Sequence, residues 1–105
     1  LPLARMLKDT KQAIIVCGDT LKSNNAWMLD CSTAAQNILL AAESMGLGAV
    51  WTAAYPYPER MQVVRDALQL PEHIIPLTVI PLGYPTGQEK PKNKFNEQQI
   101  HYNKW

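Results

Sequence analysis

Three short apolar runs along the chain predict the strands of a small sheet. The first, residues 13–17 (AIIVC), is continuous and rich in β-branched side chains, which favours a buried strand. The second, residues 48–54, combines small and β-forming side chains. The third covers residues 74–82. Because Pro76 and Pro81 cannot donate to a ladder, we expect this third strand to be bulged or unpaired near both ends.

A helix is predicted between the first two runs. Residues 33–45 are rich in Ala and Leu and contain no Gly or Pro, with Asp30 and Ser32 as plausible N-caps and Gly46 at the C-terminal cap. Apolar residues cover most of its circumference. We therefore expect the helix to be buried on two sides, one against its own sheet and the other against a second subunit or another part of the protein.

A second helix and a polar tail complete the pattern. The helix should begin with Pro58 at its first position and stop before Pro71. Its single apolar stripe consists of Met61, Val64, Ala67 and Leu68. Residues 86–99 are polar, and residues 100–105 are a candidate short edge strand.

Composition and charge narrow the class of protein. With 105 residues, 47% hydrophobic and 18% charged, the chain suits one globular domain, and a net charge of +1 provides no field for nucleic acid or an anionic membrane. No apolar run reaches the length of a membrane span, and residues 1–7 lead directly into charge, so we expect no signal peptide. Cys17 and Cys31 match no disulfide or zinc framework. We expect Cys17 to be a buried reduced thiol in a cytoplasmic protein.

Side chains for acid, base or nucleophilic catalysis do not converge in this sequence. Ser32 has no neighbouring histidine, and His73 and His101 are isolated. Gly46 and Gly48 end a helix and precede a strand, which is the wrong order for a dinucleotide-binding fingerprint. We nominate no catalytic side chain and no metal site.

The lysines of the tail are the charged feature that stands out. In the sequence KPKNK at residues 90–94, an extended chain directs Lys92 and Lys94 to the same side. Two ammonium groups on one side suit a phosphate or another dianion. A solvated loop is the alternative that these residues leave open.

Several segments, in order and spacing, resemble the nitroreductase family in its shorter bacterial and archaeal form. The resemblance covers most of the chain. The matching segments are residues 27–32 (WMLDCS), 34–42 (AAQNILLAA), 46–51 (GLGAVW), 70–72 (LPE), 75–77 (IPL), 80–85 (IPLGYP) and 91–94 (PKNK), with His101 and Trp105 at the end.

The resemblance implies an α+β fold: a nitroreductase-like three-layer α/β/α sandwich with a mostly antiparallel sheet, in an intertwined homodimer. Residues 1–105 would be the C-terminal part of one such domain. The helix at residues 33–45 would lie at the dimer interface, and FMN would bind in a groove between the subunits. The family's N-terminal half, which carries an arginine-rich phosphate motif, has no counterpart in this sequence, and the chain opens without Met. We therefore expect residues 1–105 alone not to form the full flavin enzyme.

The resemblance also assigns cofactor-binding residues. In the family, the strand after Gly-Leu-Gly passes under the isoalloxazine ring and directs backbone N–H groups toward its edge and N5. The matching residues are Trp51, Thr52, Ala53, Ala54 and, at the end, Tyr55. Small alanine side chains allow a flat ring to approach the backbone. Basic residues after a proline hold the FMN phosphate, and Lys92 and Lys94 match them.

The activity implied is that of a flavoprotein oxidoreductase. Hydride from NAD(P)H would pass through FMN to a nitro compound, a quinone or another small organic acceptor, with the flavin carrying the chemistry. The alternative is a non-catalytic FMN-binding or dimerisation module that lacks the N-terminal half. A specialised relative, such as a dehalogenase or a flavin-cleaving enzyme, also stays open.

Overall fold

The computed structural model describes residues 9–105. The opening stretch, from which we expect no signal peptide, lies outside the described residues. The elements in chain order are β1 (Gln12–Asp19), α1 (Trp27–Ser44), β2 (Gly48–Ala49), β3 (Thr52–Ala53), α2 (Pro58–Leu68), β4 (Ile74–Gly83) and the single 3₁₀ turn η2 (Glu97–Gln99).

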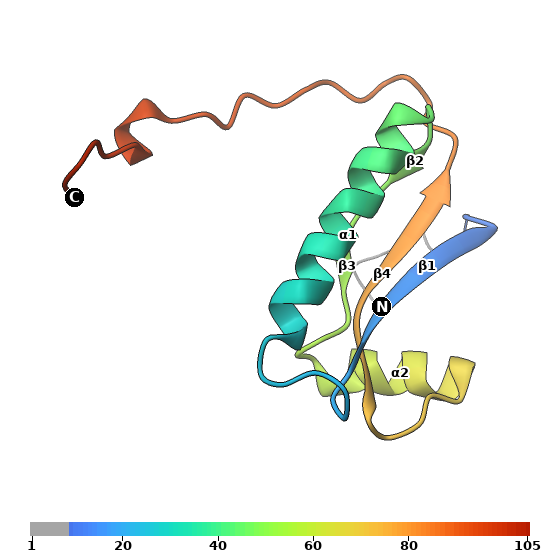
Figure 1. Cartoon of the computed structure of the whole chain (residues 1–105). Coiled ribbons are helices and arrows are strands. Elements are labelled where there is room, and N and C mark those ends of the chain that lie inside the picture. Colours follow the sequence, from blue (N-terminus) through green and yellow to red (C-terminus); the bar gives the residue numbers. More distant parts are fainter. Residues whose placement is uncertain (1–8) are drawn as a thin grey trace.

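The last strand in sequence, β4, is the centre of the sheet (Figure 1). It pairs antiparallel with β1 on one side and with β2 and β3 on the other. Every residue of β4 from Pro76 to Pro81 is consequently buried. This confirms the strand predicted for the third apolar run and shows that it is the main part of the core.

The two prolines of β4 behave differently. Near Pro76 the register with β1 shifts between Val16 and Cys17, so the predicted irregularity is confirmed there. At the other end Pro81 stays in register opposite Ala13 of β1 but has no partner on the side of β2 and β3, so the prediction is confirmed there on one side only. Pro81 lies where the ladder on the opposite side of β4 is interrupted, so we infer that its missing donor falls in this interruption.

The same interruption divides the second apolar run. We predicted one strand over residues 48–54, but β2 pairs with Leu82 and Gly83 whereas β3 pairs with Thr78 and Val79. Val50 and Trp51 belong to neither ladder. A continuous partner strand would have to face Pro81, which has no N–H to give.

The first run forms β1, but its residues are exposed or only half-buried. β1 is the terminal strand in the sheet order, its first three residues are exposed, including Ile14 at 37%, and of the whole strand only Gly18 is fully buried. The expectation of a buried strand is therefore wrong, because a terminal strand has a neighbour on one side only. Cys17 lies in the better covered half, where it is a free cysteine of intermediate burial.

Helix α1 begins earlier than its Ala- and Leu-rich pattern indicated. It starts at Trp27 with Ala26 as N-cap and has no side-chain cap. The two predicted caps are therefore wrong. Asp30 lies in the first turn, and the Ser32 hydroxyl donates a 2.6 Å hydrogen bond to the Met28 carbonyl inside the helix.

The end of α1 confirms the predicted glycine cap. Gly46 has φ +76°, which costs glycine little. Its N–H donates to the Glu43 carbonyl at 3.1 Å, and the Leu47 N–H donates to the Ala42 carbonyl at 2.9 Å. These two bonds form the Schellman motif that closes many helices.

One side of α1 packs on the sheet, where Ala35 and Ala42 are buried. The other side is open in the single chain, with Leu29 71% and Leu40 59% exposed. The first half of the burial prediction is thus confirmed. Packing of the second side against a partner stays a prediction.

Helix α2 begins at Pro58, as predicted, and ends at Leu68 before the left-handed residue Gln69. Its buried residue Val64 forms a core cluster, and the residues of that cluster or packed against it are Ala54, Val64, Val79, Ile15, Met61 and Leu70. The predicted apolar stripe is correct only in part. Ala67 is exposed, and Leu68 is 48% exposed, at the end of the helix.

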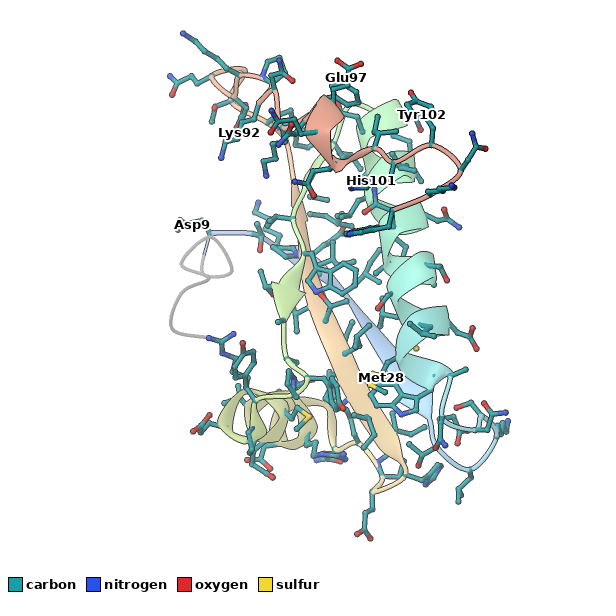
Figure 2. The ribbon with its side chains drawn as sticks, turned by 90° about the vertical axis from the view of Figure 1, so that its left-hand side faces the viewer. Asp9, Met28, Lys92, Glu97, His101 and Tyr102 are labelled. Atoms are coloured by element: carbon teal, nitrogen blue, oxygen red, sulfur yellow. The ribbon has the colours of Figure 1, made fainter. Side chains whose placement is uncertain are left out.

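The two helices lie on opposite sides of the β4 ribbon in Figure 2, which gives the α+β, three-layer order that we predicted. Figure 1 shows the chain after β4 leaving this body and running past the end of α1. Residues 100–105 form no strand, so that prediction is wrong. Instead the rings of His101 and Trp105 stack 4.2 Å apart. In the part of the chain that the structure describes, no helix is long and apolar enough to cross a membrane.

Candidate functional site

The segment from Trp51 to Tyr55 leaves the sheet through a tightly bonded turn. The backbone N–H groups of Ala54 and Tyr55 both donate to the Leu77 carbonyl, at 3.0 and 3.2 Å. The Ala54 carbonyl accepts from the Tyr57 N–H at 2.9 Å. Ala54 itself is fully buried in the core cluster, so its small side chain packs in the core and anchors this end of the segment.

Two threonine hydroxyls fix the middle of this segment to β4. Thr78 is fully buried, and its hydroxyl donates to the Thr52 carbonyl at 2.8 Å. The Thr52 hydroxyl donates in turn to the Val79 carbonyl. This reciprocal pair satisfies the buried hydroxyl of Thr78 and holds Thr52 firmly against the central strand.

An arginine approaches the same segment from α2. The Arg60 guanidinium donates to the Ala53 carbonyl at 3.4 Å and stacks over the Tyr57 ring, 4.2 Å from its centroid. The carbonyls of Thr52, Ala53 and Ala54 therefore all accept hydrogen bonds from their own chain. A backbone whose acceptors are all occupied is preorganised, because few alternative positions satisfy the same bonds.

Trp27 contacts the end of this segment and Gly18 leaves room for its ring, and sequence reasoning missed both roles. Trp27, the first residue of α1, packs edge-on against Tyr55, with ring centroids 5.0 Å apart and planes at 77°. A side chain at Gly18 would place its Cβ 2.4 Å from the Trp27 ring. A glycine after the first apolar run was visible in the sequence, but the proximity of Gly18 to Trp27 was not.

The predicted phosphate lysines are not near this segment. Lys92 and Lys94 are exposed on the tail. Figure 2 labels Lys92 beyond one end of the sheet, whereas Met28, in the first turn of α1, lies near the other. A single chain therefore does not bring the two halves of the predicted FMN site together, and both assignments stay predictions.

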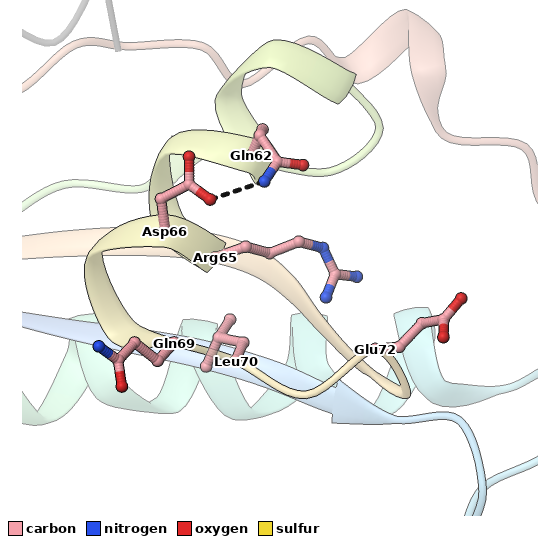
Figure 3. A pocket seen from close by; sticks show the side chains of 6 residues that line it. All are labelled: Gln62, Arg65, Asp66, Gln69, Leu70 and Glu72. Atoms are coloured by element: carbon pink, nitrogen blue, oxygen red, sulfur yellow. Dashed lines mark hydrogen bonds between the residues drawn. The ribbon is translucent and has the colours of Figure 1, made fainter.

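Surface pockets do not substitute for such a site. A pocket of about 780 Å³ at the C-terminal end of α2 is lined by Gln62, Arg65, Asp66, Gln69, Leu70 and Glu72 (Figure 3). Its polar groups partly satisfy one another, since the Gln62 amide donates to Asp66 at 2.7 Å. A second pocket, of about 550 Å³, borders Val50 and includes the carboxylates of Glu43 and Glu89, which would repel a phosphate.

The two cysteines are free thiols that are partly buried. Burial raises the pKa of the Cys17 thiol, Cys31 raises it further, and Arg65 opposes the change. Burial also raises the pKa of Cys31, with a smaller contribution from Asp30. Thiols with raised pKa values stay protonated and are poor nucleophiles at neutral pH.

The fold and this segment define the class of protein. An antiparallel sheet with a helix on each side, and a short strand leading into a bonded turn, describe an α+β protein of the kind that the resemblance implied. The model of the Nitroreductase family matches residues 4–84, and the chain belongs to that family.

Similar solved structures support the assignment to this family. A crystal structure from Parabacteroides distasonis, provisionally named an NADH dehydrogenase/NAD(P)H nitroreductase, superposes with a TM-score of 0.96 at 71% identity and covers 100% of this chain and 62% of its own. An FMN-dependent nitroreductase from Clostridium difficile superposes with a TM-score of 0.87 at 27% identity, over 94% of this chain and 61% of its own.

Among the curated relatives, a Methanothermobacter thermautotrophicus protein with the same provisional name is 49% identical, over 99% of this chain and 56% of its own length. An FMN reductase (NADPH) of Bacillus subtilis is 32% identical over 71% of this chain and 29% of its own length. The chain thus spans little more than half the length of the more similar curated relative. The family is established, and the activity of the whole protein is a proposal.

Proposed function

We propose that this protein is an FMN-dependent oxidoreductase that passes hydride from NAD(P)H to a small organic acceptor such as a nitro compound or a quinone. The observation that supports this most is the segment from Trp51 to Ala54. In a chain of the nitroreductase family, Trp51, Thr52 and Ala53 are partly exposed. The carbonyls of Thr52, Ala53 and Ala54 already accept hydrogen bonds from the chain itself. The relatives named as NAD(P)H oxidoreductases and as an FMN reductase point the same way.

The exposure and size of the residues in this segment suit the binding of a flat FMN ring. Trp51, Thr52 and Ala53 are partly exposed, and the Ala53 side chain is small enough for a planar ring to lie close to the backbone. FMN supplies the two-electron chemistry when bound. The chain supplies a fixed surface beneath the ring and excludes water from one of its faces. Ala54 would act mainly by holding its neighbours, because its N–H donates to Leu77.

The lysines would complete the site from a second copy of the chain. In the single chain the tail runs away from the segment (Figure 1), and the outer face of α1 exposes Leu29 and Leu40. A homodimer that covers this face of α1 and receives the tail would bury the exposed side chains of Leu29 and Leu40. Lys92 and Lys94 of one copy would then bind the phosphate of an FMN whose ring lies on the other copy.

The test compares two double variants in FMN binding. Lys92→Ala with Lys94→Ala should weaken FMN binding by about 2 to 4 kcal/mol, the scale of hydrogen bonds to charged groups. Lys11→Ala with Lys22→Ala removes the same formal charge from exposed sites elsewhere and should change the FMN Kd little. Equal losses in the two double variants would mean that only net charge matters, and unchanged affinity in the first would remove the lysines from the site.

Activity separates this proposal from its alternative. We expect a purified protein of the relatives' full length that contains this chain to retain FMN through desalting and to oxidise NAD(P)H when a quinone or nitro compound is added. Residues 1–105 alone should lose the flavin. Retention of FMN with no oxidation of either NADH or NADPH would favour a non-catalytic FMN-binding module. Loss of all flavin from a folded, dimeric protein would refute the proposed function.

A further inference from the structure

Three elements meet at the point where the candidate segment leaves the sheet. Trp27 is the first residue of α1, Gly18 lies near the end of β1, and Tyr55 follows β3. The Trp27 ring occupies the space that a side chain at position 18 would fill, with the ring carbon 2.4 Å from the Cβ position. Its edge-to-face contact with Tyr55 closes the arrangement at 5.0 Å between centroids.

We infer that Trp27 is a positioning residue for the flavin-contact segment: its ring, admitted against β1 by the missing side chain of Gly18, packs on Tyr55 and sets where the backbone of the segment lies. This inference rests on the proposed function, because it assigns a role in binding FMN rather than in folding alone. Trp27 would not touch the cofactor. It would act through Tyr55.

The backbone bonds explain why one ring contact matters. The N–H groups of Ala54 and Tyr55 share a single acceptor, the Leu77 carbonyl, so the end of the segment is tied to β4 at one point. The Tyr55 ring adds a second restraint there, because it packs against the edge of the Trp27 ring. A small displacement of a binding surface is enough to weaken a ligand that needs several backbone contacts at once.

The experiment uses variants of a protein of the relatives' full length that contains this chain. It measures the FMN Kd by flavin fluorescence and the melting temperature of the flavin-free protein. Trp27→Leu removes the aromatic edge and should raise the Kd about tenfold, the upper range of what an aromatic pair contributes. Trp27→Phe keeps a ring edge toward Tyr55 and should restore most of the affinity. Leu82→Ala, at the other end of β4, is the control for general loss of stability, and its Kd should stay near that of the wild type.

Gly18→Ala tests the same contact without removing any atom from the site. The added methyl group displaces the Trp27 ring and should raise the Kd in a similar way. With Trp27→Leu already present, Gly18→Ala should add little, because the ring that it would displace is gone.

The outcomes are distinct. Failure of the wild type to bind FMN would refute the proposed function, and this inference with it. A wild type that binds FMN, together with equal Kd changes in Trp27→Leu and Leu82→Ala at equal loss of melting temperature, would leave the proposed function intact and overturn the positioning role. Fully additive effects of Gly18→Ala and Trp27→Leu on the Kd would also overturn it.

Discussion

The hydroxyl of Thr78 is the buried polar group on which the candidate segment depends, and Thr78→Val isolates its contribution. Thr78 is fully buried at the centre of β4, and its hydroxyl donates to the Thr52 carbonyl at 2.8 Å. Valine has nearly the same shape but no donor. The substitution therefore removes one hydrogen bond and leaves the Thr52 carbonyl without this partner.

Two opposing contributions set the magnitude. A buried acceptor that loses its partner costs about 1 to 3 kcal/mol. The methyl group that replaces the hydroxyl recovers up to about 0.8 kcal/mol of apolar burial. Since Thr52 is only partly buried, the lower half of the cost applies. We expect Thr78→Val to lower the free energy of unfolding by about 1 kcal/mol, and to weaken FMN binding because Thr52 is released from β4.

Urea unfolding followed by tryptophan fluorescence measures the stability, and flavin fluorescence measures the affinity. Thr78→Ser is the matched control. It keeps the donor but loses a buried methyl group, so it should lose a similar free energy of unfolding while keeping its FMN affinity. If the valine variant were as stable as the wild type and bound FMN equally well, the hydrogen bond from Thr78 would not be what fixes the segment.

Three further predictions concern other parts of the fold. Gly46→Ala should lower the free energy of unfolding by about 1 kcal/mol through backbone strain alone, because φ is +76° and no atom lies within 4 Å of the added Cβ; an unchanged denaturation midpoint would contradict the Schellman cap. Leu40→Asp, 59% exposed on α1, should abolish a dimer in sedimentation, whereas Val63→Asp, 56% exposed on α2, should leave it intact; a dimer in both variants would exclude this face of α1. Because burial raises the pKa of Cys17, the folded protein keeps the thiol proton to a higher pH than the unfolded chain, and the stability that this contributes is lost as the pH rises above about 8.5. The difference in free energy of unfolding between the wild type and Cys17→Ala should therefore shrink between pH 7 and 10. A constant difference would contradict this.

The sequence alone determined the features that depend on neighbouring residues. Pro58 at the first position of α2 and Gly46 after α1 were both correct, because these residue types restrict or permit backbone angles in the same way in any fold. The apolar run at the centre of β4 was equally clear, since a strand buried on both faces is apolar at nearly every position. The family also followed from the sequence, through the order of its short motifs.

Tertiary structure decided everything that depends on which segments become neighbours. The division into β2 and β3 follows from a proline in the strand that they face, and the exposure of half of β1 follows from its place at the sheet edge. Helix α1 begins early, at Trp27, and the ring of Trp27 packs against Gly18 and Tyr55. These contacts join residues far apart in the chain, and a local pattern records only the preferences of each residue. Which distant side chain fills the space beside a glycine depends on packing, and packing is settled only when the whole sheet has formed.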